Sequence, residues 1–265
     1  MRDETPIAPA ISGRFARDGY VKMEQFISRE KAQGLRAAIA AEVAAYEAGA
    51  RQGDPRYIFA RTNHILEISN LFNIVAELSD LSLHRQLAAT AAQLIDVSSL
   101  RVYHDALLYK RSEHPAVPWH QDEFFSVLDG KVITAWMPLV PVDQAGGALV
   151  YASGSDRRGL INRDEFGGDA AVSAYIARQG YELCCPSMVP GDVLFHNGHV
   201  FHRSEVNRTD TPRIAYSVFL FEDGACIRPP IFGRQDIVDL IYFPGRGVGD
   251  RADTALNPVV YVARK

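Results

Sequence analysis

The chain has 265 residues, of which 47% are hydrophobic, 23% charged and 10% aromatic, a composition typical of globular proteins. Its 28 basic and 32 acidic side chains give a formal charge of -4 without long runs of one sign, which argues against binding to nucleic acid or anionic membranes. The longest uncharged apolar segment, 132–142, is about half of a membrane span and contains two prolines. The N-terminal residues lack the apolar stretch of a secretory signal, and three cysteines form no disulfide framework, so we expect a cytoplasmic protein.

The N-terminal third of the chain is predicted to be mainly helical. Residues 1–12 are charged and then rich in proline and alanine, without periodicity, and are predicted to be a flexible leader. A helix is predicted over 28–48, because Ser28 can cap its start, Gly49 can end it and apolar residues recur on one face. These apolar residues are Ala32, Leu35, Ile39, Val43 and Tyr46. A second helical region is predicted over 71–95, divided near Asp80 or Ser82.

After about residue 99 the pattern changes to short segments that are rich in β-branched and aromatic residues and are separated by Gly, Pro, Asp and Asn. Strands are predicted over 101–110, 131–140, 148–152, 192–196 and 213–221. Because strands and helices do not alternate, a doubly wound α/β fold is disfavoured. We expect a mostly β protein with N-terminal helices and a double-stranded β-helix core of the jelly-roll, cupin-like kind.

This pattern predicts one domain over residues 13–265. It would comprise a helical part (13–98), a β core (99–222) and a loop-rich C-terminal extension. Three segments with many Gly, Pro and charged residues are candidate lids over a site: 51–70, 157–180 and 223–250.

Six of the eight histidines lie between residues 104 and 202, which suggests a metal site in the β core. His120 and Asp122 are two residues apart, so in an extended chain their side chains point to the same side. A third ligand could come from His196, His199 or His202, about eighty residues further on. Two histidines and one carboxylate, with the remaining positions open, are typical of non-haem Fe(II) oxygenases.

Arg213 stands at the start of a predicted apolar strand, where an unpaired guanidinium is costly. It therefore requires an anionic partner, and a dicarboxylate that reaches in from the metal would provide one.

Several segments resemble, in order, the motifs of the phytanoyl-CoA dioxygenase family of Fe(II)- and 2-oxoglutarate-dependent oxygenases. GRFARDGYVKMEQFIS resembles the N-terminal region of the family. The core motifs have counterparts in YHDALLYK, PWHQDEFF, ITAWMPLVPVDQAGGALVYASGSD and GDVLFHNGHVFHRSEVNRTDTPR. The resemblance covers about residues 13–221. Two segments depart from the family pattern. Gly146-Gly147 stands where the family often has Asn-Gly, which keeps the turn without the Asn, and SGSD stands where it more often has GSH, outside the metal site and on the substrate side.

The resemblance implies that His120, Asp122 and His202 bind Fe(II). His196 and His199 are alternative third ligands, although the spacing to the following arginine fits His202. Because the carboxylate ligand is present, hydroxylation is favoured over halogenation.

The resemblance also implies that Arg213 and Ser204 hold the far carboxylate of 2-oxoglutarate. Trp136 would line the cosubstrate pocket, and Gln121 would lie just behind the ligands. For the substrate we name His104, Tyr103 and Phe124 as candidate contacts, each of which could equally be a core residue.

The expected reaction consumes O₂ and 2-oxoglutarate, releases succinate and CO₂, and hydroxylates an unactivated C–H bond of a small organic metabolite, in secondary-metabolite tailoring for instance. Desaturation, epimerisation and cyclisation are variants of the same chemistry. A zinc enzyme without redox chemistry and a catalytically silent jelly-roll binding protein are the alternatives. The sequence does not indicate an oligomeric state.

Overall fold

The computed structural model describes residues 6–50, 58–61, 65–112, 114–161, 167–229 and 242–263. The larger of its two antiparallel sheets has eight strands in the order β1-β9-β6-β11-β4-β3-β2, with β12 also paired to β4. These strands are β1 (Tyr20–Met23), β2 (Ile58–Arg61), β3 (Leu66–Ser69), β4 (Ser99–Lys110), β6 (Val132–Pro138), β9 (Val193–Asn197), β11 (Arg213–Glu222) and β12 (Val259–Val262).

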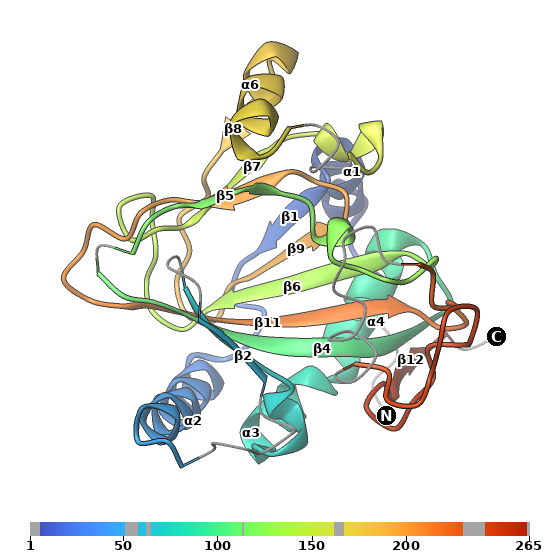
Figure 1. Cartoon of the computed structure of the whole chain (residues 1–265), viewed down its shortest axis with the longest axis horizontal. Helices are drawn as coiled ribbons and strands as arrows, with labels where there is room; N and C mark the ends of the chain where they lie inside the picture. Colours follow the sequence, from blue (N-terminus) through green and yellow to red (C-terminus); the bar gives the residue numbers. More distant parts are fainter. Residues whose placement is uncertain are drawn as a thin grey trace.

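The smaller sheet has four strands in the order β5-β10-β7-β8 and faces the larger sheet (Figure 1). Its strands are β5 (Val117–His120), β7 (Leu149–Ala152), β8 (Leu183–Cys184) and β10 (His202–Ser204). This pair of facing antiparallel sheets, preceded by helices, confirms the predicted fold class. All five strands predicted from the sequence are present, each within two residues of its expected bounds.

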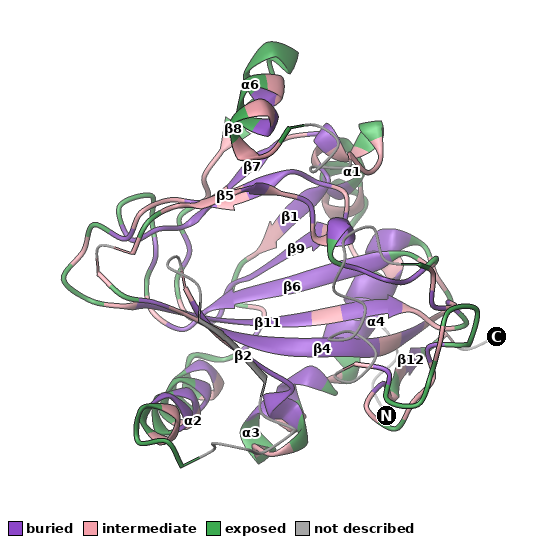
Figure 2. Cartoon of the chain, viewed as in Figure 1, coloured by how far each residue is buried: buried purple, intermediate pink, exposed green. Residues whose placement is uncertain are grey.

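Helices cover the outer face of the larger sheet (Figure 1). They are α1 (Pro9–Asp18), α2 (Arg29–Glu47), α3 (Ala76–Ser82) and α4 (Arg85–Ile95), while α6 (Asp169–Gln179) lies beside the smaller sheet. The predicted face of α2 is buried at Ala32, Leu35, Ile39 and Val43, and Ser28 Oγ accepts the expected capping hydrogen bond from Lys31 N. One hydrophobic cluster joins these helical residues to the outer face of the strands, so the helical and β parts share a core (Figure 2).

Several expectations about connections are corrected by the structure. The predicted flexible leader, 1–12, is too long, because helix α1 already begins at Pro9 and Ile7 packs against the core. A proline in the first turn of a helix costs no hydrogen bond, because the N–H it lacks would be unpaired there. Residues 71–95 form the 3₁₀ turn η1 (Leu71–Asn73) followed by α3 and α4, divided after Ser82 as expected.

The three candidate lids are not simply loops. Strands β2 and β3 lie within 51–70, helix α6 lies within 157–180, and β12 lies in the expected loop-rich extension. Residues 51–57, 62–64, 162–166 and 230–241 of these predicted lids lie outside the described part of the chain.

The alternation of β11 separates the helix-covered face of the larger sheet from the face that looks at the smaller sheet. Ile214, Tyr216, Val218 and Leu220 belong to the core under the helices. The intervening residues Arg213, Ser217 and Phe219 line a cavity between the sheets. This side-chain period of two places polar residues of the larger sheet on the cavity side. Among the helices of the described residues, none is long and apolar enough to cross a membrane.

Candidate active site

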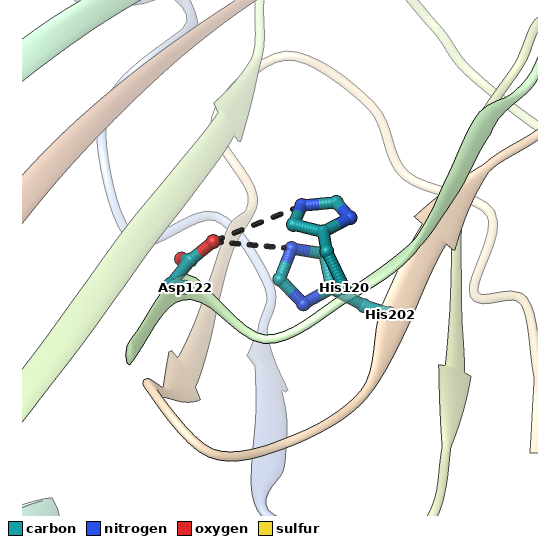
Figure 3. Close-up of side chains that lie close together, drawn as sticks. All are labelled: His120, Asp122 and His202. Atoms are coloured by element: carbon teal, nitrogen blue, oxygen red, sulfur yellow. Dashed lines mark ion pairs between the residues drawn. The ribbon is translucent and has the colours of Figure 1, made fainter. Parts of the chain in front are cut away.

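Strand pairing in the smaller sheet brings the two histidine clusters together. His120 is the last residue of β5, and His202, the first of β10, is its partner in the antiparallel register. Asp122 begins the short 3₁₀ turn η2 (Asp122–Phe124) that follows β5. One ligand atom from each of the three side chains lies within 4.8 Å of the others (Figure 3). Asp122 Oδ1 is 3.8 Å from His120 Nε2 and 3.5 Å from His202 Nε2.

Backbone carbonyls orient both imidazoles towards this centre. His120 Nδ1 is 2.8 Å from Pro118 O, and His202 Nδ1 is 3.2 Å from Val200 O. A carbonyl oxygen can only accept, so each Nδ1 carries the proton and each Nε2 presents a lone pair. This arrangement is usual for histidines that bind metals.

The charges of the three side chains also suit a cation. Burial opposes ionisation of Asp122, but the neighbouring His202, His196 and His120 lower the pKa of its carboxyl below the usual range. Burial and the nearby His120 lower the pKa of His202 well below 6.5. A charged carboxylate and an uncharged imidazole are the forms that bind metals. The site can therefore take a divalent metal without first losing a proton from these two groups.

His196, one of the alternative third ligands, lies behind Asp122. Its Nε2 is 2.9 Å from Asp122 Oδ2, and its Nδ1 is 3.0 Å from the hydroxyl of Tyr151. Thr134 Oγ1 donates to the same Oδ2 at 2.7 Å. Two donors therefore hold Oδ2, which leaves Oδ1 directed towards His120 and His202. His199, the other alternative, is not among the described residues that line the cavity.

The three side chains lie in the wall of a cavity of about 520 Å³ between the two sheets. This volume falls in the range of small-molecule sites. Most of its wall is apolar or aromatic. A second pocket, of about 600 Å³, shares Arg213 with this wall but contains none of the three metal-site residues.

The wall of the cavity contains several buried donors that lack an acceptor. Arg213 is 3% exposed, and its Nη1 makes one long hydrogen bond, 3.4 Å, to Gly147 O. Burial lowers its pKa to about 10, and no carboxylate of the described residues pairs with it. Arg213 Nε, Trp136 Nε1 and Ser217 Oγ have no hydrogen-bond partner within the described chain. Such a group of buried donors is expensive unless a ligand supplies the acceptors.

Lys110, which is not among the predicted site residues, lies next to this group. It is fully buried, is paired with Arg213 in the β4–β11 register, and donates through Nζ to Ser204 Oγ at 2.9 Å and to Glu205 O. Burial and the charge of Arg213 lower its pKa to about 7. Because Lys110 occupies a lone pair of the Ser204 hydroxyl, the hydroxyl hydrogen can point to a ligand in the cavity.

Two of the named site residues, Gln121 and Phe124, do not line the cavity. Gln121 is buried, but its amide binds the backbone of Gly159, Ile161 and His199, so it fixes loops and does not line the cavity. Phe124 is also buried outside the cavity, and the neighbouring Phe125 lines it instead.

The other named residues lie in the wall of the cavity, which includes Trp136, Ser204, His104 and Tyr103. His104 is stacked between Phe219 and Tyr242, with ring centroids 4.1 and 4.5 Å away. The ring of Tyr103 contacts those of His104, Tyr242, Phe243 and Phe221, with centroids 5.0, 5.2, 5.4 and 5.9 Å away. Four polar residues of the wall were not predicted: Glu67, Ser126, Thr134 and Ser217.

Comparison with known proteins identifies the family. The phytanoyl-CoA dioxygenase (PhyH) family model matches residues 15–215. A probable phytanoyl-CoA dioxygenase from Caenorhabditis elegans is 29% identical over 140 residues, 49% of this chain and 45% of that protein. The 1-deoxypentalenic acid 11-beta-hydroxylase of Streptomyces arenae is 32% identical over 102 residues, 36% of each chain. This chain thus spans less than half the length of both relatives.

A solved structure shares the fold over nearly the whole chain. The non-heme alpha-ketoglutarate-dependent carbocyclase SnoK from nogalamycin biosynthesis superposes with a TM-score of 0.78, at 24% identity and with 96% of each chain covered. At this identity the likeness shows the fold alone. From the family match over residues 15–215, we conclude that this chain belongs to the phytanoyl-CoA dioxygenase family.

Proposed function

We propose that this protein is an Fe(II)- and 2-oxoglutarate-dependent dioxygenase that hydroxylates an unactivated C–H bond of a small organic metabolite. The main support is one cavity that contains both halves of the required site. His120, Asp122 and His202 converge at one place in its wall, and the unpaired guanidinium of Arg213 lies at another. A redox-neutral zinc site would need the first group but not the second.

The residues of the chain fit both cofactors. His120 Nε2, His202 Nε2 and Asp122 Oδ1 would hold the iron, since their other atoms are already hydrogen-bonded. Arg213 would bind the far carboxylate of 2-oxoglutarate, and the Ser204 hydroxyl, held by Lys110, would donate to it. When bound, the iron and 2-oxoglutarate supply the oxidation, in which O₂ is consumed, succinate and CO₂ are released, and a substrate C–H bond is oxidised.

Each residue then has a positional task. The three ligands leave room on the metal for cosubstrate and oxygen, because the protein supplies only three of its contacts. The indole ring of Trp136 lies under the guanidinium of Arg213, 5.8 Å from its central carbon, and restricts where the far carboxylate can lie. The apolar wall excludes water from the substrate, which limits unproductive turnover.

Hydroxylation of a metabolite in a tailoring pathway is the outcome we favour. It is supported by the hydroxylase from Streptomyces arenae, whose name gives a small organic acid as its substrate. The carbocyclase that shares the fold acts in the biosynthesis of a natural product, so ring closure is the related outcome.

Anaerobic titration of the metal-free protein with Fe(II), followed by 2-oxoglutarate, tests this proposal. We expect a weak visible charge-transfer band of the chelated keto acid. Admission of O₂ with substrate should then release succinate. Metal binding without such a band would instead favour a zinc enzyme or a catalytically silent binding protein.

Replacement of His196 by alanine should weaken Fe(II) binding by about 10- to 100-fold, because Asp122 Oδ2 loses one of its two donors and the carboxylate can turn. Tyr151→Phe is the matched control: it removes only the hydrogen bond to the far nitrogen of His196 and should weaken binding less than about tenfold. Fe(II) titration of the metal-free variants measures both effects. Unchanged affinity in His196→Ala would show that Thr134 alone positions Asp122.

A further inference from the structure

Glu67 is a charged residue of the cavity that the proposed chemistry does not use. It lies on β3, whose neighbouring residues Leu66 and Ile68 point into the core under the helices, while Glu67 lines the cavity. Its carboxylate accepts one long hydrogen bond, 3.3 Å, from Ser69 Oγ. No lysine, arginine or histidine of the described residues forms an ion pair with it. Burial, and to a lesser extent the charge of Asp122, raise its pKa.

The strand register places Glu67 away from the cofactor residues but on the same face of the sheet. Glu67 is opposite Leu108 of β4, and Leu108 is opposite Ala215 of β11. Neighbouring strands lie about 4.8 Å apart, so the Glu67 backbone is roughly 10 Å from that of Ala215. Arg213, two residues from Ala215, faces the same cavity. A substrate can therefore contact Glu67 without occupying the place of 2-oxoglutarate.

The surroundings of Glu67 include an uncharged aromatic wall. His104 is stacked between Phe219 and Tyr242, and burial lowers its pKa to about 4, so its ring is neutral near pH 7. Neutral aromatic faces attract cations, whereas a protonated imidazole would repel them. Ser69 Oγ donates to the Glu67 carboxylate, and the charge of Glu67, together with burial, raises the pKa of the nearby Tyr242 hydroxyl.

The cation in the wall of the cavity, Arg213, and the one behind the wall, Lys110, are already engaged in the proposed function. Arg213 would hold the far carboxylate of 2-oxoglutarate, and Lys110 Nζ contacts Ser204 Oγ and Glu205 O. On the basis of that function, we propose that the substrate carries a protonated amine, which pairs with Glu67, and an apolar body that packs along the aromatic wall. Glu67 is then the residue that selects the substrate class.

An ammonium group fits these observations better than a hydroxyl group. It brings up to three donors and a full positive charge to a carboxylate that, among the described residues, has one long hydrogen bond and no ion pair. A single hydroxyl would satisfy one lone pair but brings no positive charge to the half-buried carboxyl of Glu67, whose pKa is raised because burial disfavours the ionised form. A hydroxylated or purely apolar substrate is the outcome that contradicts the proposal.

The test compares three probes of nearly equal size: 2-phenylethylamine, 2-phenylethanol and propylbenzene. Each is titrated anaerobically into the protein loaded with Fe(II) and 2-oxoglutarate, and binding is measured by calorimetry. We expect the amine to bind about 10- to 100-fold more tightly than the alcohol. Glu67→Gln should remove this preference and leave the charge-transfer band intact. Glu182→Gln, the same change at an exposed position, should retain the preference for the amine.

Thermal unfolding of the metal-free variants provides a second measurement that needs no ligand. Because no cation of the described residues pairs with Glu67, Glu67→Gln and Glu67→Leu should raise the melting temperature by a few degrees. A fall in melting temperature in both would show that Glu67 is a structural residue and would overturn the proposal. The proposal would also be overturned if the amine bound no better than the alcohol, or if the preference for the amine survived in Glu67→Gln. The charge-transfer band reports separately on the oxygenase function, so the two failures can be told apart.

Discussion

Replacement of His202 by alanine is expected to abolish the charge-transfer band and to reduce succinate formation by more than about 100-fold. Loss of a residue that only orients a metal ligand already costs about 10- to 100-fold, and His202 is proposed as a ligand itself. The variant would retain one imidazole and one carboxylate oxygen, His120 Nε2 and Asp122 Oδ1, 3.8 Å apart. The measurements are the anaerobic titration with Fe(II) and 2-oxoglutarate, and single-turnover release of succinate.

His199→Ala is the matched control for this experiment. His199 is close in sequence and is also a histidine, but its side chain is not among the described residues lining the cavity. Its backbone carbonyl accepts from Gln121, and this contact survives the substitution. We expect near-normal Fe(II) binding and turnover. If His199→Ala lost the band while His202→Ala kept it, the assignment of the third ligand would be wrong.

The β core could be predicted because its strands carry their own signal. β4, β6 and β11 are long and rich in β-branched and aromatic residues. The strands that were not predicted are short. For example, β5 has four residues and β10 has three. These two strands pair with each other, and β10 also pairs with β7. Their strand character therefore depends on partners distant in sequence, which a local pattern does not contain.

The metal-site residues could be proposed from the sequence because two of them are neighbours in the chain. His120 and Asp122 stand two residues apart, whereas the choice among three histidines for the third ligand depended on the family resemblance. The structure adds a physical reason: His196 Nε2 is already used on Asp122 Oδ2, and His202 is paired with His120 across the sheet.

The residues around the metal site, such as Ser217 and Lys110, could not be found from spacing or from the family resemblance. Ser217 is recognisable only once the two faces of β11 are separated, since Arg213, Ser217 and Phe219 alternate with core residues. Lys110 at the end of β4 looks like an ordinary exposed strand end, yet it is fully buried because Ser204 and Glu205 approach it from a segment ninety residues away. Such a contact across the sheets depends on the tertiary fold.

Replacement of Arg213 by leucine is expected to raise the concentration of 2-oxoglutarate needed for half-saturation by about 100- to 1,000-fold. Hydrogen bonds to a charged group contribute about 1.5–3 kcal/mol each, and a guanidinium can give two to one carboxylate. Fe(II) affinity should remain unchanged, because Arg213 contacts none of the three ligands in the described structure. Titration of the Fe(II)-loaded variant with 2-oxoglutarate, followed by the charge-transfer band, measures the shift.

The stability of the same variant separates a binding role from a structural one. Within the described chain the guanidinium has only a 3.4 Å hydrogen bond to Gly147 O and no carboxylate partner, so its removal should not lower the melting temperature of the metal-free protein. Arg213→Lys keeps the charge but loses the bidentate geometry. Its half-saturating concentration of 2-oxoglutarate should therefore lie between those of the wild type and of Arg213→Leu. A variant with normal 2-oxoglutarate binding and weakened substrate binding would instead place Arg213 on the substrate. In that case the far carboxylate of the cosubstrate would have to be held by the remaining buried cation near Ser204, which is Lys110.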